Sequence, residues 1–325
     1  MKTARLLLLS CLSIFASAAS PLFGSPAAPQ SGLALVPGDS IAVAVVSLDR
    51  LRSSDLAPSL FHEADEITVN GKAAAFLKDA GLDPKRDVDV AVFSLCAGGR
   101  DEAQPLVAFE GRFDPASLSA ATASRGGTRV DGPFPYFRLP ASADLKGHRG
   151  EPGAVAFLSP RVVLAGSEPV LLHALDLYSN GRSGLPSKGA LGGMVAKVDP
   201  ASSAWVVVDA SRARELKEAS ASHESAEGPA ATVYSALRSV SWIVFQANLS
   251  SGGVDVKATG LSSDEDARQN IEDVLRGMIA AWRMAVQSKS PELVSALRKF
   301  TVTRDNQGVT IAGRIPAELF KTAKK

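Results

Sequence analysis

The residue types best suited to catalysis are sparse in this sequence of 325 residues. It has four histidines, and no two lie within five residues of each other, so neighbouring positions cannot supply a His-x-x-x-His zinc pair. The Gly-x-Ser-x-Gly turn of serine hydrolases, the phosphate-binding loop and the dinucleotide-binding Gly-x-Gly-x-x-Gly are also absent. We therefore predict no catalytic residue, no metal ligand and no cofactor from the sequence.

The better candidate for recognition is an aromatic segment. Phe134, Tyr136, Phe137 and Arg138 lie close together, and three of them are among only nineteen aromatic residues in the chain. In a strand, alternation would place Phe134 and Tyr136 on one face and Phe137 on the other. Two interpretations follow: packing in the core or between lobes, or contact of these four residues with a ligand or protein partner.

The cysteines offer little chemistry. Cys96 ends the apolar run 88–95, which favours a small apolar residue near the end of a strand over a reactive thiol. Cys11 lies within an apolar run near the N-terminus. With two cysteines, a disulfide-rich module and a cysteine-rich zinc module are excluded.

Composition is that of a folded globular protein, with 46% hydrophobic and 21% charged residues. The 35 basic residues almost balance the 34 acidic ones, for a net charge of +1. A dedicated nucleic-acid binder would show a basic surplus, so we expect no nucleic-acid partner.

The first nineteen residues have the order of a secretory signal peptide. Lys2 and Arg5 precede the apolar run 6–16, and the small residues 16–18 supply a cleavage site. The run is about eleven residues long, whereas a membrane-spanning helix needs about 20. We predict an exported protein, periplasmic or extracellular, whose mature chain has no integral membrane span. A lipoprotein anchored at Cys11 is the alternative, because residues 8–11 loosely resemble a lipobox.

The body shows strands in pairs, each pair followed by a helix. Short turns between paired strands require antiparallel pairing. The fold class that follows is α+β, with antiparallel sheets and helices on one face. The expected strands are 41–48, 88–95, 105–111, 134–139, 154–158, 161–166, 205–209, 240–249, 254–260, 300–304 and 309–314.

The two halves of the chain have similar patterns of sequence. Residues 111–118 resemble residues 313–319, since each has Gly-Arg, an apolar residue and then a proline that begins a helix. We predict an internal duplication, with two related lobes of β-β-α units that form one sheet or two. The predicted organisation is a signal peptide (1–19), a flexible lead-in (20–36), a first lobe (37–180) and a second lobe (190–325), separated by a Gly/Ser-rich linker.

The clearest predicted helix starts near residue 262. Ser262 and Glu265 have the spacing of a capping box. An apolar stripe at helical spacing follows and includes Ile271, Met278 and Trp282. We interpret this stripe as core packing; a helix on a membrane surface is the alternative, although its polar side is not rich in Lys and Arg.

These features favour a non-catalytic exported protein of the bacterial cell envelope, with a binding, interaction or scaffold role. Its partner, a protein or a small molecule, cannot be identified from sequence. Two alternatives remain: a hydrolase-like enzyme with a dispersed site, which requires His, Asp and Ser to converge in one cleft, and a carrier of an apolar ligand, which requires a deep apolar cavity.

Overall fold

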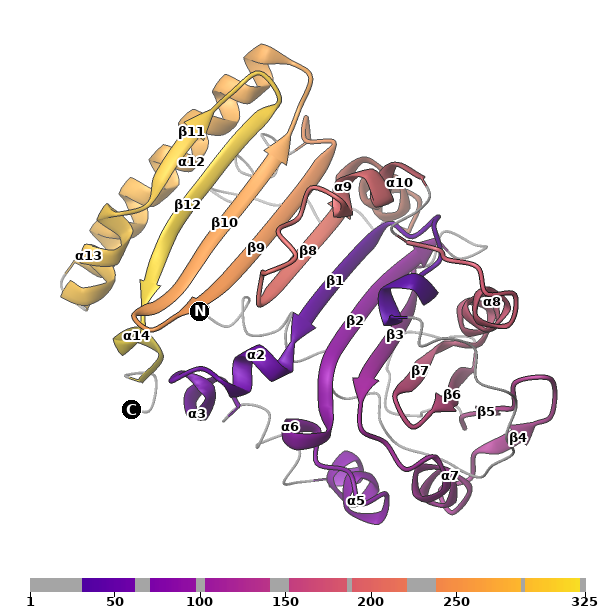
Figure 1. Ribbon diagram of the computed structural model, residues 1–325. Helices are drawn as coiled ribbons and strands as arrows, with labels where there is room; N and C mark the ends of the chain where they lie inside the picture. The colour runs from indigo at the N-terminus through magenta and orange to yellow at the C-terminus, as the bar shows by residue number, and fades with distance from the viewer. Residues whose placement is uncertain are drawn as a thin grey trace.

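The fold is built on one twelve-stranded sheet in which every pair of neighbouring strands is antiparallel (Figure 1). The structure is a computed structural model, and it describes residues 31–61, 71–97, 103–140, 152–185, 189–220, 238–287 and 290–321. The predicted signal peptide and Cys11 lie outside these residues. The α+β class is confirmed.

The first half of the chain supplies seven strands. Most follow the predicted ranges to within two residues, because each apolar run ends at a Gly- or Pro-containing turn. From the centre of the sheet outward they are β1 (Ala42–Ser47), β2 (Val88–Ala97), β3 (Ala103–Gly111), β7 (Val162–Ser167), β6 (Gly153–Ser159), β5 (Tyr136–Arg138) and β4 (Thr128–Val130).

The second half supplies the other five strands. From the centre outward they are β8 (Ala204–Asp209), β9 (Trp242–Ser250), β10 (Gly253–Leu261), β12 (Gly308–Pro316) and β11 (Thr301–Arg304). The halves join where β1 pairs with β8, from Ala42 opposite Val208 to Val46 opposite Ala204. The predicted lobes therefore share one continuous sheet. Their origin by duplication stays a prediction.

Helices cover both faces of the sheet in the first half, so the prediction of helices on one face is wrong there. Along β3, Leu106 and Ala108 belong to one buried cluster, whereas Val107 and Phe109 belong to another. The first cluster, on the face toward the viewer in Figure 1, contains residues of α8 (Glu168–Ser179), α9 (Gly189–Val195) and the short 3-10 helix η1 (Gly32–Leu35). The second, on the far face, contains residues of α5 (Gly71–Asp79) and α7 (Pro115–Ala123).

In the second half, α9 packs over β8 on the near face, whereas α12 (Glu265–Val286) packs on the far face. Ile271 and Ile279 of α12 pack with Val302 and Val309 of β11 and β12. Next to them, α3 (Ala57–Leu60) and α14 (Glu318–Lys321) flank a small cluster around Val254. The remaining helices are α2 (Leu48–Arg52), α6 (Pro84–Asp87), α10 (Ala210–Ser220) and α13 (Pro291–Arg298).

Two helix starts test the capping predictions. The side chain of Asp114 accepts a hydrogen bond from the N–H of Ala116, which confirms the predicted start of α7. The capping box of Ser262 and Glu265 is wrong: Asp264 is the N-cap of α12 and accepts from the N–H groups of residues 266 and 267. Glu265 instead forms ion pairs with Arg268 and Arg304.

Two segments predicted to be irregular are packed. Gly189–Val195 is helix α9, in which Leu191 and Val195 are buried, so a packed helix begins where the Gly/Ser-rich linker was expected to end. The end of the predicted lead-in also differs from a flexible segment, because Leu35 and Val36 are 0% and 1% exposed. Within the described residues, none of the helices has the length and apolar character needed to cross a membrane.

Candidate functional site

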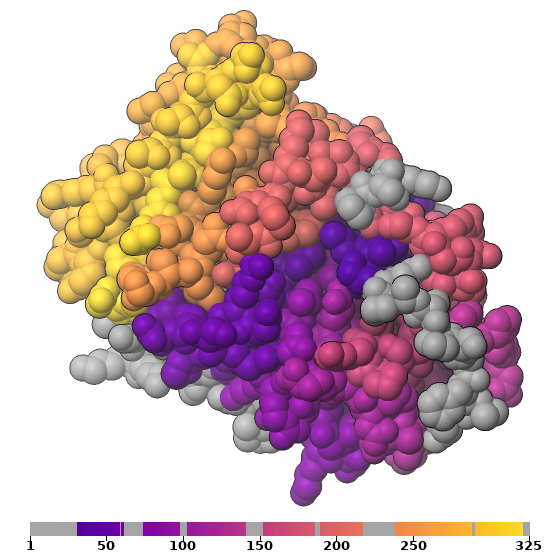
Figure 2. All heavy atoms as spheres, in the orientation of Figure 1, coloured from indigo at the N-terminus to yellow at the C-terminus, as the bar shows by residue number. Residues whose placement is uncertain are grey.

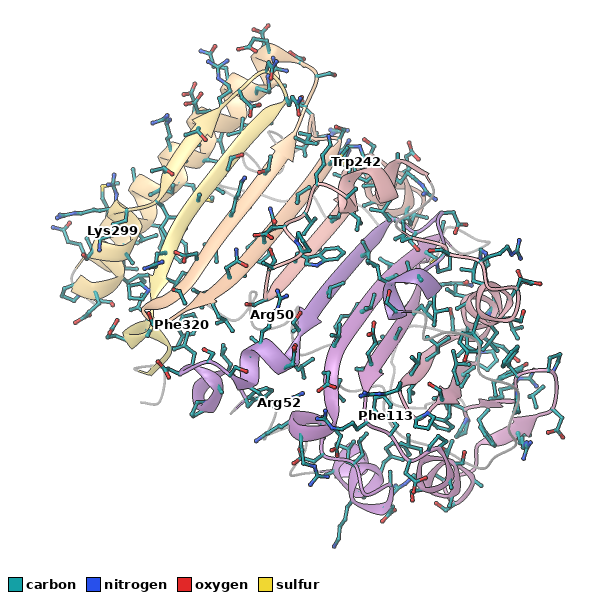
Figure 3. The ribbon with its side chains drawn as sticks, viewed as in Figure 1. Arg50, Arg52, Phe113, Trp242, Lys299 and Phe320 are labelled. Carbon is teal, nitrogen blue, oxygen red and sulfur yellow. The ribbon has the colours of Figure 1, made fainter. Side chains whose placement is uncertain are left out.

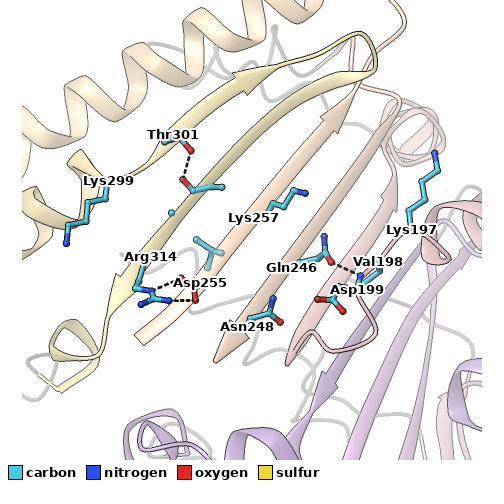
Figure 4. Close-up of a pocket in the computed structure, with 13 residues that line it drawn as sticks. Lys197, Val198, Asp199, Gln246, Asn248, Asp255, Lys257, Lys299, Thr301 and Arg314 are labelled. Carbon is cyan, nitrogen blue, oxygen red and sulfur yellow. Dashed lines mark hydrogen bonds and ion pairs between the residues drawn. The ribbon is translucent and has the colours of Figure 1, made fainter. Parts of the chain in front are cut away.

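A hollow of about 660 Å³ lies on the near face of the second half of the sheet. Its floor is formed by β9, β10 and β12, and it is bounded by β11 on one side and by the connection between α9 and β8 on the other (Figure 4). Figure 2 shows atoms of the same strands, in orange and yellow, at the molecular surface. The lining residues are Lys197, Val198, Asp199, Gln246, Asn248, Asp255, Val256, Lys257, Lys299, Thr301, Ala312, Gly313 and Arg314.

Antiparallel register brings these residues together. Lys257 of β10 is directly opposite Gln246 of β9 and Ala312 of β12, and Ala312 in turn is opposite Thr301 of β11. Since Ala312 has a short side chain, the floor is low between Lys257 and Thr301. Two residues before Lys257 on β10, Asp255 lies between Asn248 and Arg314.

The charges of the hollow are unequal. Arg314 donates two hydrogen bonds of 2.6 Å to Asp255, and this contact holds the pKa of the Asp255 carboxyl below its usual value. Lys197, Lys257 and Lys299 remain, all exposed, and none forms a salt bridge with a carboxylate in the described part of the chain. Figure 3 shows Lys299 at the outer edge, beside α13.

Two amide side chains complete the polar lining. The N–H of Asp199 donates to Oε1 of Gln246 at 2.8 Å, which leaves the Gln246 NH₂ group as a donor. The Oδ1 atom of Asn248 is buried without a hydrogen-bond partner. Buried acceptors in folded proteins are normally satisfied, so this atom indicates a missing donor.

The aromatic segment predicted from sequence lies in the first half, far along the sheet from the hollow. Tyr136 and Phe137 are 8% and 3% exposed and belong to the two clusters on opposite faces of the sheet, as alternation predicts. Phe134 packs edge-on against Tyr178, with ring centroids 5.1 Å apart. These contacts favour the core-packing interpretation; a role of the segment in binding stays a prediction.

Arg138 ends this segment in an ion pair. Its guanidinium donates to both carboxylate oxygens of Glu168, and the hydroxyl of Tyr136 donates to Oε1 of Glu168 at 2.5 Å. The bonds from Arg138 hold the pKa of Glu168 below its usual value. Because Glu168 is the first residue of α8, its contacts with Tyr136 and Arg138 connect that helix to strand β5.

The variant Glu168→Gln tests this contact through pH. Because the folded-state pKa of Glu168 is depressed, its carboxylate adds stability above the ordinary glutamate pKa, and this stability is lost as the pH falls through the folded-state pKa. We therefore expect a deficit of about 1 kcal/mol at pH 7 that shrinks as the pH falls into the acid range. Glu292, an exposed glutamate in the first turn of α13, is the control. Urea unfolding across pH measures both variants; equal deficits at pH 7 and pH 3 would contradict the assignment.

A second surface lies on α12. The predicted core packing is wrong for two members of its stripe, Met278 and Trp282, which are 39% and 49% exposed; Met284, outside the stripe, is 70% exposed. The stripe meets the sheet through Ile271 and Ile279, with Val274 and Leu275 packed against the same cluster. The sequence periodicity predicts the helix correctly but does not reveal where the sheet beneath it ends.

The histidine and the cysteine within the described ranges lie on different elements, α8 and β2. No group of three or more His, Cys, Asp or Glu residues there has the geometry to hold a metal ion. His173 is exposed on α8, and His62, His148 and His223 lie outside the described residues. Cys96 is buried beside Ser40, with Sγ and Oγ 3.1 Å apart, and burial raises the pKa of its thiol.

Comparison with known proteins identifies the fold only. Neither a known protein family nor a curated protein sequence matches this chain. Crystal structures of a protein called TP0453, in forms I, III and IV, are similar, with TM-scores of 0.49, 0.50 and 0.49 and sequence identities of 10, 9 and 8%. The similarity covers 91, 91 and 90% of this chain and 98, 98 and 96% of TP0453. At such low identity the likeness shows a shared architecture and nothing of function.

Proposed function

We propose that this chain is an exported, non-catalytic binding protein of the bacterial cell envelope, and that it holds its partner on the open near face of β9, β10 and β12. The observation that carries the proposal is the hollow on this face. Elsewhere on the near face, α8, α9 and η1 bury the sheet, whereas here Lys257 and Thr301 are exposed and Gln246 and Ala312 are half-buried. The signal-peptide pattern of residues 1–19 supports export.

The character of the hollow favours binding over the two alternatives. A carrier of an apolar molecule needs an enclosed apolar cavity, but this hollow is open and carries charged and amide side chains. A hydrolase needs a nucleophile and a base within hydrogen-bond reach. The lining includes the hydroxyl of Thr301 and no histidine, and that hydroxyl donates to the carbonyl of Ala312.

Site-specific photo-cross-linking in cells of the native host tests the proposal. A benzophenone amino acid replaces Lys257 at the centre of the hollow, and in a matched strain it replaces Lys78, an exposed lysine of α5. We expect one adduct of defined mass at position 257 and none at position 78. Equal adduct patterns at the two positions, or no adduct at 257, would rule out a binding face here.

The exposed stripe of α12 gives a second candidate function, contact with a lipid surface. Met278 and Trp282 lie one turn apart on α12 and are 39% and 49% exposed, and large apolar side chains of this kind enter the interfacial region of bilayers. The same cross-linker at position 282 distinguishes the candidates. Lipid adducts at 282 with none at 257 would favour membrane contact over partner binding on the sheet.

A further inference from the structure

The three lysines of the hollow are spread across the strands. Lys257 lies on β10, Lys299 lies next to β11, and Lys197 lies in the connection that reaches Gln246 of β9 through Asp199. Because neighbouring strands are about 4.8 Å apart, Lys257 is about 10 Å from the strand beside Lys299. Figure 4 shows the three side chains at the left, centre and right of the hollow.

The separation of the three lysines favours an extended ligand over a small one. A hydrogen bond from an ammonium group to a carboxylate or phosphate oxygen is about 2.8 Å long, so one small anion cannot engage cations this far apart. A chain that crosses the strands and carries several negative charges can reach all three. With Asp255 and Arg314 neutralising each other, three lysines face one remaining carboxylate, Asp199, and leave the hollow positive, whereas the whole chain is almost neutral.

The remaining lining distinguishes a peptide from other polyanions. None of the lining residues is aromatic, so the stacking platform by which proteins hold nucleic-acid bases is missing from this hollow. The unsatisfied Oδ1 of Asn248 needs an N–H donor, and Gln246 offers an NH₂ group to a carbonyl. A peptide main chain supplies both an N–H and a C=O at every residue, whereas polyphosphate supplies only acceptors.

We propose that this hollow binds an extended acidic segment of a partner protein, with carboxylates at Lys197, Lys257 and Lys299 and a main-chain N–H at Oδ1 of Asn248. The inference rests on the proposed function, since it names the partner for the same face. It predicts two separable contributions to affinity, one that is screened by salt and one that requires the amide.

The test uses the mature chain and a fluorescein-labelled peptide of about eight alternating Glu and Gly residues, which extended spans more than 20 Å and presents its carboxylates on one side. The decisive variant is Lys197→Gln/Lys257→Gln/Lys299→Gln. Its control, Lys78→Gln/Arg182→Gln/Arg283→Gln, removes equal charge from exposed or half-buried positions on other elements. Fluorescence anisotropy measures the affinity, and circular dichroism checks that each variant is folded.

We expect the decisive variant to bind about tenfold or more weakly than the wild type, and the control less than about twofold more weakly. Asn248→Leu should weaken the peptide several-fold and leave the affinity for polyphosphate unchanged. Equal losses in both triple variants, or tighter binding of polyphosphate than of peptide, would overturn the acidic-segment assignment. No peptide binding combined with an adduct at position 257 would refute this inference and leave the proposed function standing; no binding and no adduct would refute both.

Discussion

Replacing Leu171 by alanine is expected to lower the free energy of unfolding by about 3 kcal/mol, within the range of about 2–5 kcal/mol measured for buried Leu→Ala changes. Leu171 lies on α8 and is 0% exposed in the near-face cluster, where Leu106 and Leu164 of β3 and β7 are also buried. The loss has two sources. The methyl and methylene groups removed from Leu171 no longer gain free energy by leaving water on folding, and the neighbouring strands cannot close the cavity that remains.

The adjacent residue supplies the control for this prediction. Leu172 is on the same helix, has the same side chain and is 43% exposed, so Leu172→Ala changes helix propensity equally but removes little packing. We expect a change below about 0.5–1 kcal/mol for this variant. Urea unfolding followed by circular dichroism measures both. Similar losses for the two variants would mean that α8 does not pack on the sheet as described.

Gly184→Ala is expected to destabilise the protein by about 2–3 kcal/mol through a steric clash. A Cβ atom at residue 184 would lie 1.9 Å from the backbone oxygen of Val36, so the two segments must move apart. They are joined by hydrogen bonds from the N–H of Gly184 to the carbonyl of Ala34 and from the N–H of Leu185 to the carbonyl of Val36, at 2.8 and 3.0 Å. The substitution weakens both bonds and loosens η1.

Gly193→Ala is the matched control. Gly193 is an exposed residue of α9, and an added Cβ there meets no atom within 4 Å. Because alanine favours a helix over glycine, we expect this variant to be unchanged or more stable by up to about 1 kcal/mol. Thermal unfolding compares the variants, and limited proteolysis near residue 36 reports on η1. If Gly184→Ala matched the control in both assays, the segment before β1 would not be part of the core.

Sequence pattern predicted the strands well because each carries its own signal. The run at 240–249 and the run at 254–260 flank a Ser- and Gly-containing turn, and they correspond to β9 and β10. Strand β4 was missed because it holds one apolar residue, Val130, whereas the equally short β5 carries Tyr136 and Phe137. Helix α9 was missed because its glycines are typical of loops; burial of Leu191 outweighs that local preference.

The sequence also carries a signal of which strands are covered on both faces. The apolar run 88–95 is nearly continuous, which is typical of a strand buried on both faces. By contrast, polar residues alternate along 246–248 and 255–257, as expected of strands with one open face. The hollow itself could not be predicted, since its lining comes from five separate segments and only the strand register shows that they are neighbours.

The pairing of β1 with β8 has a consequence for how the chain is made. Synthesis proceeds from the N-terminus, so β1, β2, β3, β6 and β7 are all complete before β8 exists. Until then the apolar strand 42–46 is an unprotected edge, open to pairing with another nascent chain. β8 follows β7 by roughly 40 residues, a delay of several seconds at typical rates of synthesis. During that interval a chaperone that shields β1 would raise the yield of correctly joined sheets.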